Sequence, residues 1–451
     1  MSSHLDTHRF TRRSVLGLAA AAAVSPLAAS CSSRSAPNKL VIWTPLTDTI
    51  TFPAQQQIVA LFEKAHPGVH VILAKKPSQA TGDATSIITA VRSGTAPDVY
   101  IADRFTVAQY AGIGLLESIQ PLVNAAGGPE LTDKYLKYAM TEASYNGQAY
   151  GLPFDTDDRA LFYNKTLLRR AGVDLSALDP KNGPISVDEL IPLAAKANKK
   201  DARGNYTVIG FIPWSGQGFY ATWVLGFGAK YFDNASCSVT LTEPAFQETF
   251  DDFDKWARAL DYQKVAAFTA TYQPPNAPPS QTPFLTNHLA MAIDGNFGLS
   301  SLRKYAKDLD YGVTYLPVAK KGDKPFTWAG GFAATIPKGA KNPELAFEFM
   351  KFMTGETGQR LYTKETAHLP TWASLLDDAE LVADQKFFAD ILKYARSRPP
   401  LPVGAQLDDA MNTASQAVLL GDSTPKQALE IAQTRIQDQM KDFCPYTIAA
   451  S

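Results

Sequence analysis

Short runs of apolar and β-branched residues alternate with helical patterns in the first third of the chain. Three runs have the length and composition of strands, at residues 39–43, 69–74 and 98–103, and a helical pattern begins at Pro53 between the first two. Alternation of strands with helices is typical of βαβ units. The pattern therefore predicts an α/β fold that contains parallel sheet.

A second set of apolar runs follows a long helical region, at residues 207–211, 289–293, 311–316 and 332–336. Two α/β lobes explain two separated strand sets better than one sheet does. Several helix starts carry capping or proline signals, namely Ser186 with Glu189, Thr242 with Pro244, Asn342 with Pro343, and Thr424 with Pro425. The pattern of the last third of the chain is mostly helical. Residues 272–283 are too rich in proline for a helix or strand and predict a surface loop, which could border a cleft.

Composition and charge remove several classes of protein. The chain has 451 residues, of which 45% are hydrophobic and 19% charged, so a globular protein of two or three domains is expected. The net charge is -1, from 43 basic and 44 acidic residues, and no basic field is available to hold a nucleic acid. Three cysteines allow at most one intramolecular disulfide.

The first 30 residues predict an export signal. Arg12 and Arg13 precede an apolar run over 15–29, which is too short to span a membrane, and the run leads to Cys31. The stretch around the two arginines resembles the twin-arginine signature, and the residues before Cys31 resemble a bacterial lipobox. Lipidation of Cys31 is therefore expected, with 31–38 as a flexible tether; ordinary cleavage after small residues is the alternative. Cys237 and Cys444 then remain, either as a disulfide or as two separate thiols.

Common enzyme signatures are missing. His66 and His70 are separated by Pro67 and Gly68, which break the helix that a zinc pair would need, and no phosphate-binding loop or nucleophile elbow is present. Carboxylates are the remaining catalytic candidates, because three lie in one loop and one follows a strand: Asp155, Asp157, Asp158 and Asp294. We expect no metal and no cofactor.

Four segments together resemble the extracellular solute-binding proteins of sugar ABC transporters: residues 97–119, 146–173, 284–297 and 311–354. The resemblance runs from about Lys39 to the C-terminus with the motifs in family order. It implies a type II periplasmic-binding-protein-like fold, in which two lobes, each a central sheet flanked by helices, close about a hinge. The implied lobes are 39–153 with 331–368, and 154–330 with 369–451.

The resemblance also implies ligand-binding residues. In the first lobe these are Asp48 and Asp103 with Arg104, and in the segment that crosses to the second lobe Asp157. In the second lobe the stretch 213–223 supplies Trp214, Gln217 and Phe219, and Phe297 stands where the maltose-binding members have tryptophan; Trp328 completes the set. These residue types suit a sugar, because charged groups bond to hydroxyls and flat rings cover the apolar face of the sugar ring.

The implied function is capture of a sugar or oligosaccharide, possibly maltodextrin-like, and its delivery to an ABC permease without covalent chemistry. The protein would be anchored by lipid to the outer face of the cell membrane. Two alternatives remain: capture of a glycerophosphodiester or another polar solute, and a glycoside-processing enzyme. A guanidinium binds phosphate as readily as a hydroxyl, so Arg104 does not separate the first two, whereas the lack of a second cleft cation would favour a sugar.

Overall fold

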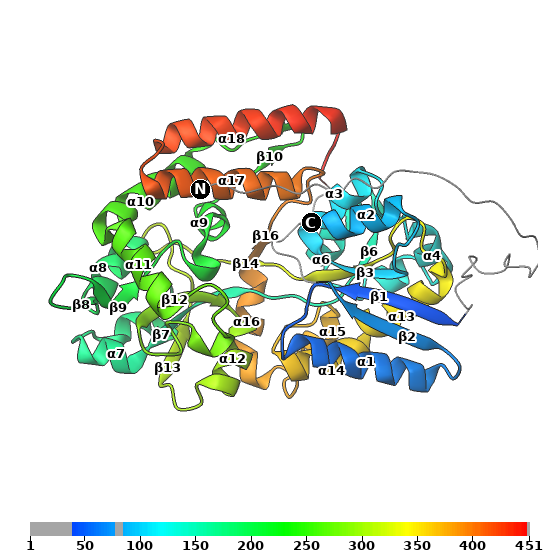
Figure 1. Cartoon of the computed structure of the whole chain (residues 1–451), viewed down its shortest axis with the longest axis horizontal. Helices are drawn as coiled ribbons and strands as arrows, with labels where there is room; N and C mark the ends of the chain where they lie inside the picture. Colours follow the sequence, from blue (N-terminus) through cyan, green and yellow to red (C-terminus); the bar gives the residue numbers. More distant parts are fainter. Residues whose placement is uncertain (1–37, 77–83, 449–451) are drawn as a thin grey trace, which may run out of the picture. The chain divides into compact units, whose positions relative to one another are not determined.

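The computed structural model describes residues 38–76 and 84–448. The predicted export signal, Cys31 and the tether up to residue 37 lie outside these residues. The two largest sheets in the described part of the chain have five strands each, and helices cover both faces of each sheet (Figure 1). The described residues form one compact unit.

The first sheet has the strand order β2-β1-β3-β15-β6. Its strands are β1 (Lys39–Thr44), β2 (His70–Lys75), β3 (Val99–Asp103), β6 (Gly151–Pro153) and β15 (Phe332–Thr335). Parallel pairing joins β1 to β2 and to β3, as the βαβ pattern predicts. Val99 and Ile101 pack on one face of the sheet and Tyr100 and Ala102 on the other, which explains the continuous apolar run in β3.

The position of β15 corrects the expectation from the strand pattern, which groups residues 332–336 with the second set, whereas the lobe boundaries implied by the resemblance place 331–368 in the first lobe. Its sequence follows the second strand set along the chain, yet β15 pairs antiparallel with β3 and with β6 in the first sheet. The chain returns to the first sheet immediately before β15, after the short strand β14 (Thr327–Ala329) has paired with β16 (Ala395–Ser397). Order along the chain does not determine sheet membership once the backbone has crossed between sheets.

The second sheet has the order β13-β7-β12-β9-β8. Its strands are β7 (Arg159–Asn164), β8 (Lys199–Lys200), β9 (Tyr206–Phe211), β12 (Leu289–Gly295) and β13 (Tyr311–Thr314). The central strand β12 pairs antiparallel with β7 and parallel with β9. Three of these strands occupy runs that the sequence predicts: β9, β12 and β13.

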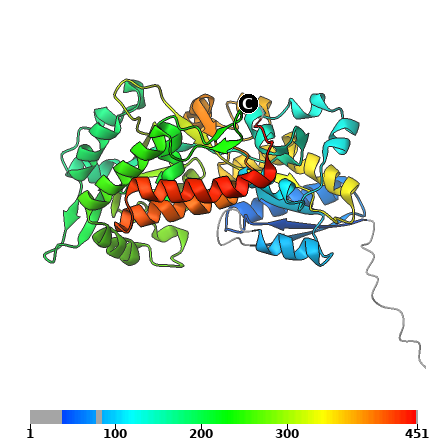
Figure 2. The same ribbon diagram turned by 90° about the horizontal axis from the view of Figure 1, so that it is seen from above.

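Helices cover both faces of each sheet. Around the first sheet lie α1 (Thr51–Ala65), α2 (Thr85–Arg92), α3 (Arg104–Gly112), α4 (Gln120–Ala125), α5 (Pro129–Thr132), α6 (Lys137–Glu142), α13 (Pro343–Thr354) and α14 (Glu356–Thr366). One face of the second sheet packs against α7 (Lys165–Arg170), α8 (Val187–Ala195), α9 (Tyr220–Gly226), α10 (Pro244–Leu260), α17 (Gly404–Leu420) and α18 (Pro425–Met440). Its other face packs against α11 (Tyr262–Tyr272), α12 (Gly298–Tyr305) and α16 (Lys386–Ile391). Figures 1 and 2 show α17 and α18 side by side.

The predicted helix starts are confirmed. Ser186 and Glu189 form a capping box before α8, and Thr424 and Gln427 form one before α18. Proline occupies the first turn of α10 and of α13, where its missing N–H costs no hydrogen bond. These four helices therefore begin where the capping and proline signals predict.

Three backbone segments cross between the two sheets next to one another. Residues 154–158 connect β6 to β7, residues 330–331 connect β14 to β15, and residues 367–371 follow α14. Paired amides and carbonyls link them, since Thr156 bridges to Leu369 and Asp157 bridges to Gly330. The two sheets are therefore joined by a small hydrogen-bonded bundle of extended chain.

Cys237 and Cys444 are joined as a disulfide, with their Cα atoms 6.1 Å apart. This bond decides between the two states that the sequence leaves open. It ties the turn between β10 (Phe232–Asp233) and β11 (Ser238–Val239) to the end of the chain after α18. Among the described helices, none is both long and apolar enough to span a membrane.

Candidate functional site

A cavity of about 320 Å³ lies beside the three crossing segments, and we call it the central cavity. Its walls come from connections of both sheets: the loop after β1, the end of β3, the three crossings, the 3-10 turn at 216–218, the start of α12 and the chain after β16. Because strand ends and connections converge here, the fold brings polar side chains from distant parts of the sequence into one space. Five residues that the resemblance implies for the site line the central cavity: Asp48, Asp103, Asp157, Gln217 and Phe297.

Asp103 and Arg398 form one ion pair of the cavity wall. Nη2 of Arg398 lies 3.2 Å from Oδ1 and 3.3 Å from Oδ2 of Asp103. Asp103 also accepts from the amide of Phe105 at the start of α3, and the guanidinium of Arg398 lies 3.7 Å from the centre of the Phe105 ring. Burial raises the pKa of Asp103 although Arg398 opposes the shift. The pair is held in place by a helix start and by an aromatic ring.

Asp157 and Arg159 form a second ion pair. Asp157 accepts the amide of Gly330 at 2.8 Å, and Nε of Arg159 donates to Gln217 at 3.1 Å. Burial alone would raise the pKa of Asp157, but Arg159 outweighs it and the pKa is lowered. The carboxylate is therefore charged at neutral pH and linked to the crossing segments.

Aromatic rings pack against side chains of the cavity wall. Trp328 is 1% exposed, and the guanidinium carbon of Arg159 lies 3.4 Å from its ring centroid. Phe297 lines the cavity and stacks against the ring of His368, with 5.7 Å between the centroids. Trp328 therefore supports the cavity through Arg159, whereas Phe297 faces the cavity itself.

His368 belongs to the third crossing. Its Nδ1 lies 2.7 Å from Oδ2 of Asp155, close enough for an ion pair, although their angle is not that of a hydrogen bond. Burial would lower the pKa of His368, but the carboxylates of Asp155 and Asp157 outweigh it and raise this pKa. The imidazole of His368 is thus held beside a carboxylate at the cavity wall.

Asp48 lies in the loop that leads into α1 and is exposed. It accepts from the amides of Ile50 at 2.7 Å and Thr51 at 2.9 Å, as a residue near a helix start does. Burial would raise the pKa of Asp48, but these bonds and the Thr51 hydroxyl lower it. Its carboxylate is the most accessible acceptor of the three that line the cavity.

Arg104 does not reach the cavity. It is fully buried, its Nε donates to Glu142 at 2.9 Å, and its other donors bond to the carbonyls of Asp155 and Gly330. The expected pair of Asp103 with Arg104 is therefore replaced by the pair of Asp103 with Arg398. Successive residues at the start of a helix point in different directions, so adjacent positions in the sequence need not share a site.

Two aromatic residues named by resemblance also pack elsewhere. Trp214 packs against Tyr262, with ring centroids 6.1 Å apart, and Phe219 packs edge-on against Trp328 at 5.6 Å. Neither lines the central cavity. The neighbouring Gln217 is the member of this stretch that does, because the 3-10 turn at 216–218 carries it there.

The sequence did not single out three basic residues of the cavity wall: Arg159, His368 and Arg398. Arg159 begins β7 directly after the acidic loop, and Arg398 follows β16 just before two prolines. A basic residue at the end of a strand is a weak signal that could have drawn attention to either. Their place in one cavity depends on crossings that only the three-dimensional structure reveals.

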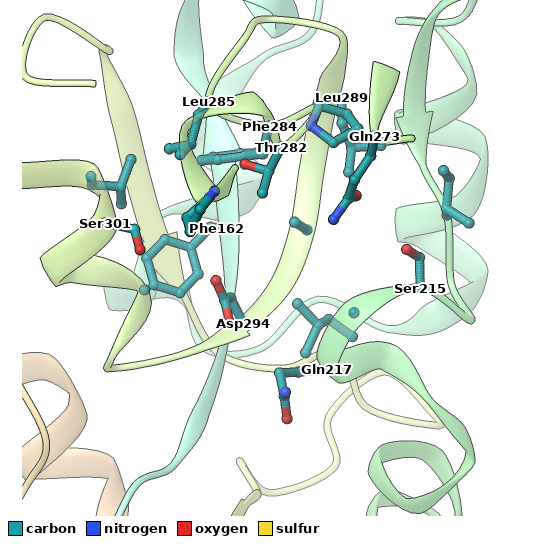
Figure 3. A pocket seen from close by; sticks show the side chains of 18 residues that line it. Phe162, Ser215, Gln217, Gln273, Thr282, Phe284, Leu285, Leu289, Asp294 and Ser301 are labelled. Atoms are coloured by element: carbon teal, nitrogen blue, oxygen red, sulfur yellow. The ribbon is translucent and has the colours of Figure 1, made fainter. Parts of the chain in front are cut away.

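A second cavity of about 220 Å³ adjoins the first, and we call it the side cavity (Figure 3). It lies between the second sheet, α12 and the proline-rich loop after α11. Asp294, at the end of β12, is its one charged lining residue, and burial raises the pKa of this carboxyl to about 6. Gln217, Pro279 and Ser301 line both cavities. The proline-rich loop therefore borders the site.

No cluster of three or more metal-ligating side chains occurs in residues 38–76 and 84–448. His66 and His70 do not converge: His66 stacks on Phe62, whereas His70 pairs with Glu63.

Comparison with known proteins places this chain in a family. The model of the bacterial extracellular solute-binding protein family matches residues 43–360. The chain belongs to this family. Among its relatives, a maltooligosaccharide ABC transporter solute-binding lipoprotein of Streptococcus pneumoniae is 25% identical over 395 residues, which cover 86% of each chain. A galactooligosaccharide-binding protein of Bacillus subtilis is 23% identical and covers 91% of this chain and 92% of the relative.

Solved structures of this solute-binding class share the fold. CpMnBP1 with mannotriose bound has a TM-score of 0.76 at 25% identity and covers 88% of this chain and 99% of that one. The GacH receptor of Streptomyces glaucescens has a TM-score of 0.68 at 23% identity, with coverage of 90% and 98%, and shows the fold alone. The fold is the type II periplasmic-binding-protein fold, as predicted.

Proposed function

We propose that this solute-binding protein captures a sugar or oligosaccharide in the central cavity and delivers it to the permease of an ABC importer. The observation that carries the proposal is the pairing of Asp103 with Arg398 and of Asp157 with Arg159 around one cavity of about 320 Å³. Supporting it, the relatives in Streptococcus and Bacillus are named for oligosaccharides.

Such pairs suit sugar hydroxyls because each hydroxyl donates one hydrogen bond and accepts others. Carboxylate oxygens accept and guanidinium nitrogens donate, and bonds to charged partners contribute ~1.5–3 kcal/mol each. Nε of Arg398 is buried without a hydrogen-bond partner among the described residues, so one donor of this guanidinium is unsatisfied. Phe297 offers the flat apolar surface that the C–H face of a sugar ring needs.

Charge balance favours a sugar over a phosphodiester. Two arginines line the cavity, Arg159 and Arg398, so the lack of a second cleft cation, which would have favoured a sugar, is not found. Each of them, however, is neutralised by a carboxylate, and Asp48 adds a further negative charge. A phosphate would meet repulsion as well as attraction, whereas a neutral sugar uses both signs.

We propose further that the two lobes close about the bundle of crossing segments when the ligand binds. The lobes would be 39–153 with 331–368 and 154–330 with 369–451. Contacts between α12 and the loop after β1 support this: Tyr305 lies 3.2 Å and Nζ of Lys304 3.0 Å from Oγ1 of Thr49. These exposed groups would separate and rejoin as the cavity opens and closes.

A thermal-shift screen across mono-, di- and trisaccharides tests the function. A sugar at 100 times its dissociation constant should stabilise the protein by ~2.7 kcal/mol and raise the unfolding temperature. Mass spectrometry of the recovered ligand then checks for chemistry, since a binding protein returns the saccharide intact. Cleaved product would favour the glycoside-processing alternative, and stabilisation by glycerophosphodiesters alone would favour that class.

The proposal includes export of the protein and a lipid anchor on Cys31. This anchor would hold the protein on the outer face of the cell membrane. Cys31→Ala should release the protein into the medium, whereas the wild type should remain with the membrane fraction. A wild-type protein already soluble in the medium, with an unmodified N-terminus at Cys31 or Ser32, would contradict the anchor.

A further inference from the structure

The side cavity has walls of a different kind from those of the central cavity. Most of its lining is apolar: Phe162, Ile212, Phe284, Leu285, Leu289 and Leu302. No lysine, arginine or histidine lines it. Its volume of about 220 Å³ is enough for a ring-sized group. The side cavity therefore suits a chemical group that is less polar than the ligand of the central cavity.

A second sugar ring is a poor occupant. Such a ring brings several hydroxyls, and each hydroxyl buried without a partner costs free energy. The polar side chains of the side cavity stand apart on different elements, as Ser215, Gln273 and Ser301 do in Figure 3. An apolar ring with one polar substituent would match these walls better.

Asp294 supplies the partner for that one substituent. Its Oδ1 accepts the amide of Gly295 at 2.8 Å, while Oδ2 accepts no hydrogen bond from any residue in the described part of the chain. Figure 3 places the carboxyl between Phe162 and Gln217. A hydroxyl on the edge of an apolar ring could donate to this free oxygen.

The two cavities adjoin at three residues. Gln217, Pro279 and Ser301 line both, so a ligand held in the central cavity can extend past them. Building on the proposed function, we infer that the side cavity binds the aglycone of a glycoside: an aromatic ring, with a hydroxyl that donates to Asp294, attached to the sugar in the central cavity. The substrate class is then an aryl glycoside rather than an unsubstituted oligosaccharide.

Matched pairs of ligands test this inference by titration calorimetry. Methyl, phenyl and 4-hydroxyphenyl glycosides of glucose, galactose and mannose differ only in the group offered to the side cavity. For the sugar that binds, the phenyl glycoside should bind roughly tenfold to hundredfold more tightly than the methyl glycoside, because an apolar ring leaves water. The 4-hydroxyphenyl glycoside should bind about tenfold more tightly again.

Two variants locate the effect. Ala292→Phe fills the side cavity and should remove the gain from the phenyl group while leaving methyl glycoside affinity within about twofold; Ala292 lines only this cavity. Asp294→Asn preserves the shape and should remove most of the gain from the hydroxyl. Asp308→Asn, at an exposed position, is the matched control and should change nothing.

A crystal structure with a 4-bromophenyl glycoside gives a direct readout, with the bromine expected beside Phe162. Equal affinity for methyl and phenyl glycosides, or a bromine outside the side cavity, would overturn the inference and leave sugar capture standing. A gain that persists in Ala292→Phe would also overturn it. If no glycoside of either kind binds although a saccharide from the thermal-shift screen does, the inference fails and sugar capture stands; if no saccharide binds either, both fail.

Discussion

The basic side chains around the central cavity are held by neighbouring carboxylates and aromatic rings. Arg398 is held by Asp103 and Phe105, and Arg159 is held by Asp157 and by the ring of Trp328. A charged group that is already fixed loses little conformational freedom when a ligand arrives. These residues therefore favour binding through preorganisation as well as through charge.

The sequence predicted the types of the cavity residues better than the directions in which their side chains point. Asp103 and Asp157 end or precede strands, and Gln217 lies in a tight turn, so the sequence places them at one edge of the fold. Arg104 and Phe219 stand beside cavity residues in the sequence and point into the protein instead. A motif fixes the backbone position, whereas packing against distant elements decides which way each side chain points.

Arg104 is predicted to act through stability and not through ligand contact. Arg104→Ala leaves Glu142 buried without its partner and should lower the free energy of unfolding by about 3–5 kcal/mol. The double variant Arg104→Met with Glu142→Leu should recover most of this loss, because no buried charge then remains. Urea unfolding measures both variants. A stable Arg104→Ala protein with weakened sugar binding would show instead that Arg104 contacts the ligand.

Asp158 predicts a pH dependence of stability. It is fully buried, neither carboxylate oxygen has a hydrogen-bond partner among the described residues, and burial followed by the charge of Asp157 raises its pKa well above 3.8. The folded protein therefore holds this proton more tightly than the unfolded chain does. The stability that Asp158 contributes is complete below pH 3.8 and is lost as the pH rises through the raised pKa.

Asp158→Asn removes this titration, so the variant should gain stability relative to the wild type as the pH rises. Urea unfolding of both proteins at pH 4, 6 and 8 would measure the difference. A constant difference across this range would contradict the assigned shift.

At the scale of elements, local signals predicted more than long-range pairing. Capping boxes at Ser186 and Thr424 and prolines at 244 and 343 mark helices where the structure has them. The partner of β15 could not be predicted in the same way, because sheet membership depends on contacts between residues more than 200 positions apart. The segments that cross between the sheets show no local sequence pattern that would mark them as crossings.

Gly331 shows what these crossings require. Its φ is +133°, and a Cβ there would overlap Nη1 of Arg104 and the carbonyl oxygen of Asp155. Gly331→Ala should lower the free energy of unfolding by about 2–4 kcal/mol, from backbone strain and overpacking. Gly339→Ala is the control, because Gly339 also has a positive φ, +82°, but has open space around it. That control should lose only about 1 kcal/mol. Equal losses in chemical unfolding would mean that crowding at the crossing adds nothing.

At the scale of the whole molecule, the disulfide closes a long loop. Cys237 and Cys444 are 207 positions apart, so the bond restricts the unfolded chain strongly. The variant with both cysteines changed to Ala should lose about 2–5 kcal/mol of stability. A reductant should lower the thermal unfolding temperature of the wild type toward that of the variant and should leave the variant unchanged. No effect of reductant on the wild type would mean that the bond does not restrain unfolding.

The central claim is that a sugar binds between the two sheets and forms hydrogen bonds with Asp103 and Arg398. Titration calorimetry of the best saccharide from the screen, against the wild type and Asp103→Asn, tests it most directly. Asn can still cap α3 and still offers an amide oxygen to Arg398, so the variant should fold, with some loss of stability because the ion pair is gone. The lost charge should cost ~1.5–3 kcal/mol of binding, or roughly tenfold to hundredfold in affinity. We predict one site in the wild type and this loss in the variant. Equal affinity in the two proteins, or no saccharide binding by the wild type, would contradict the account.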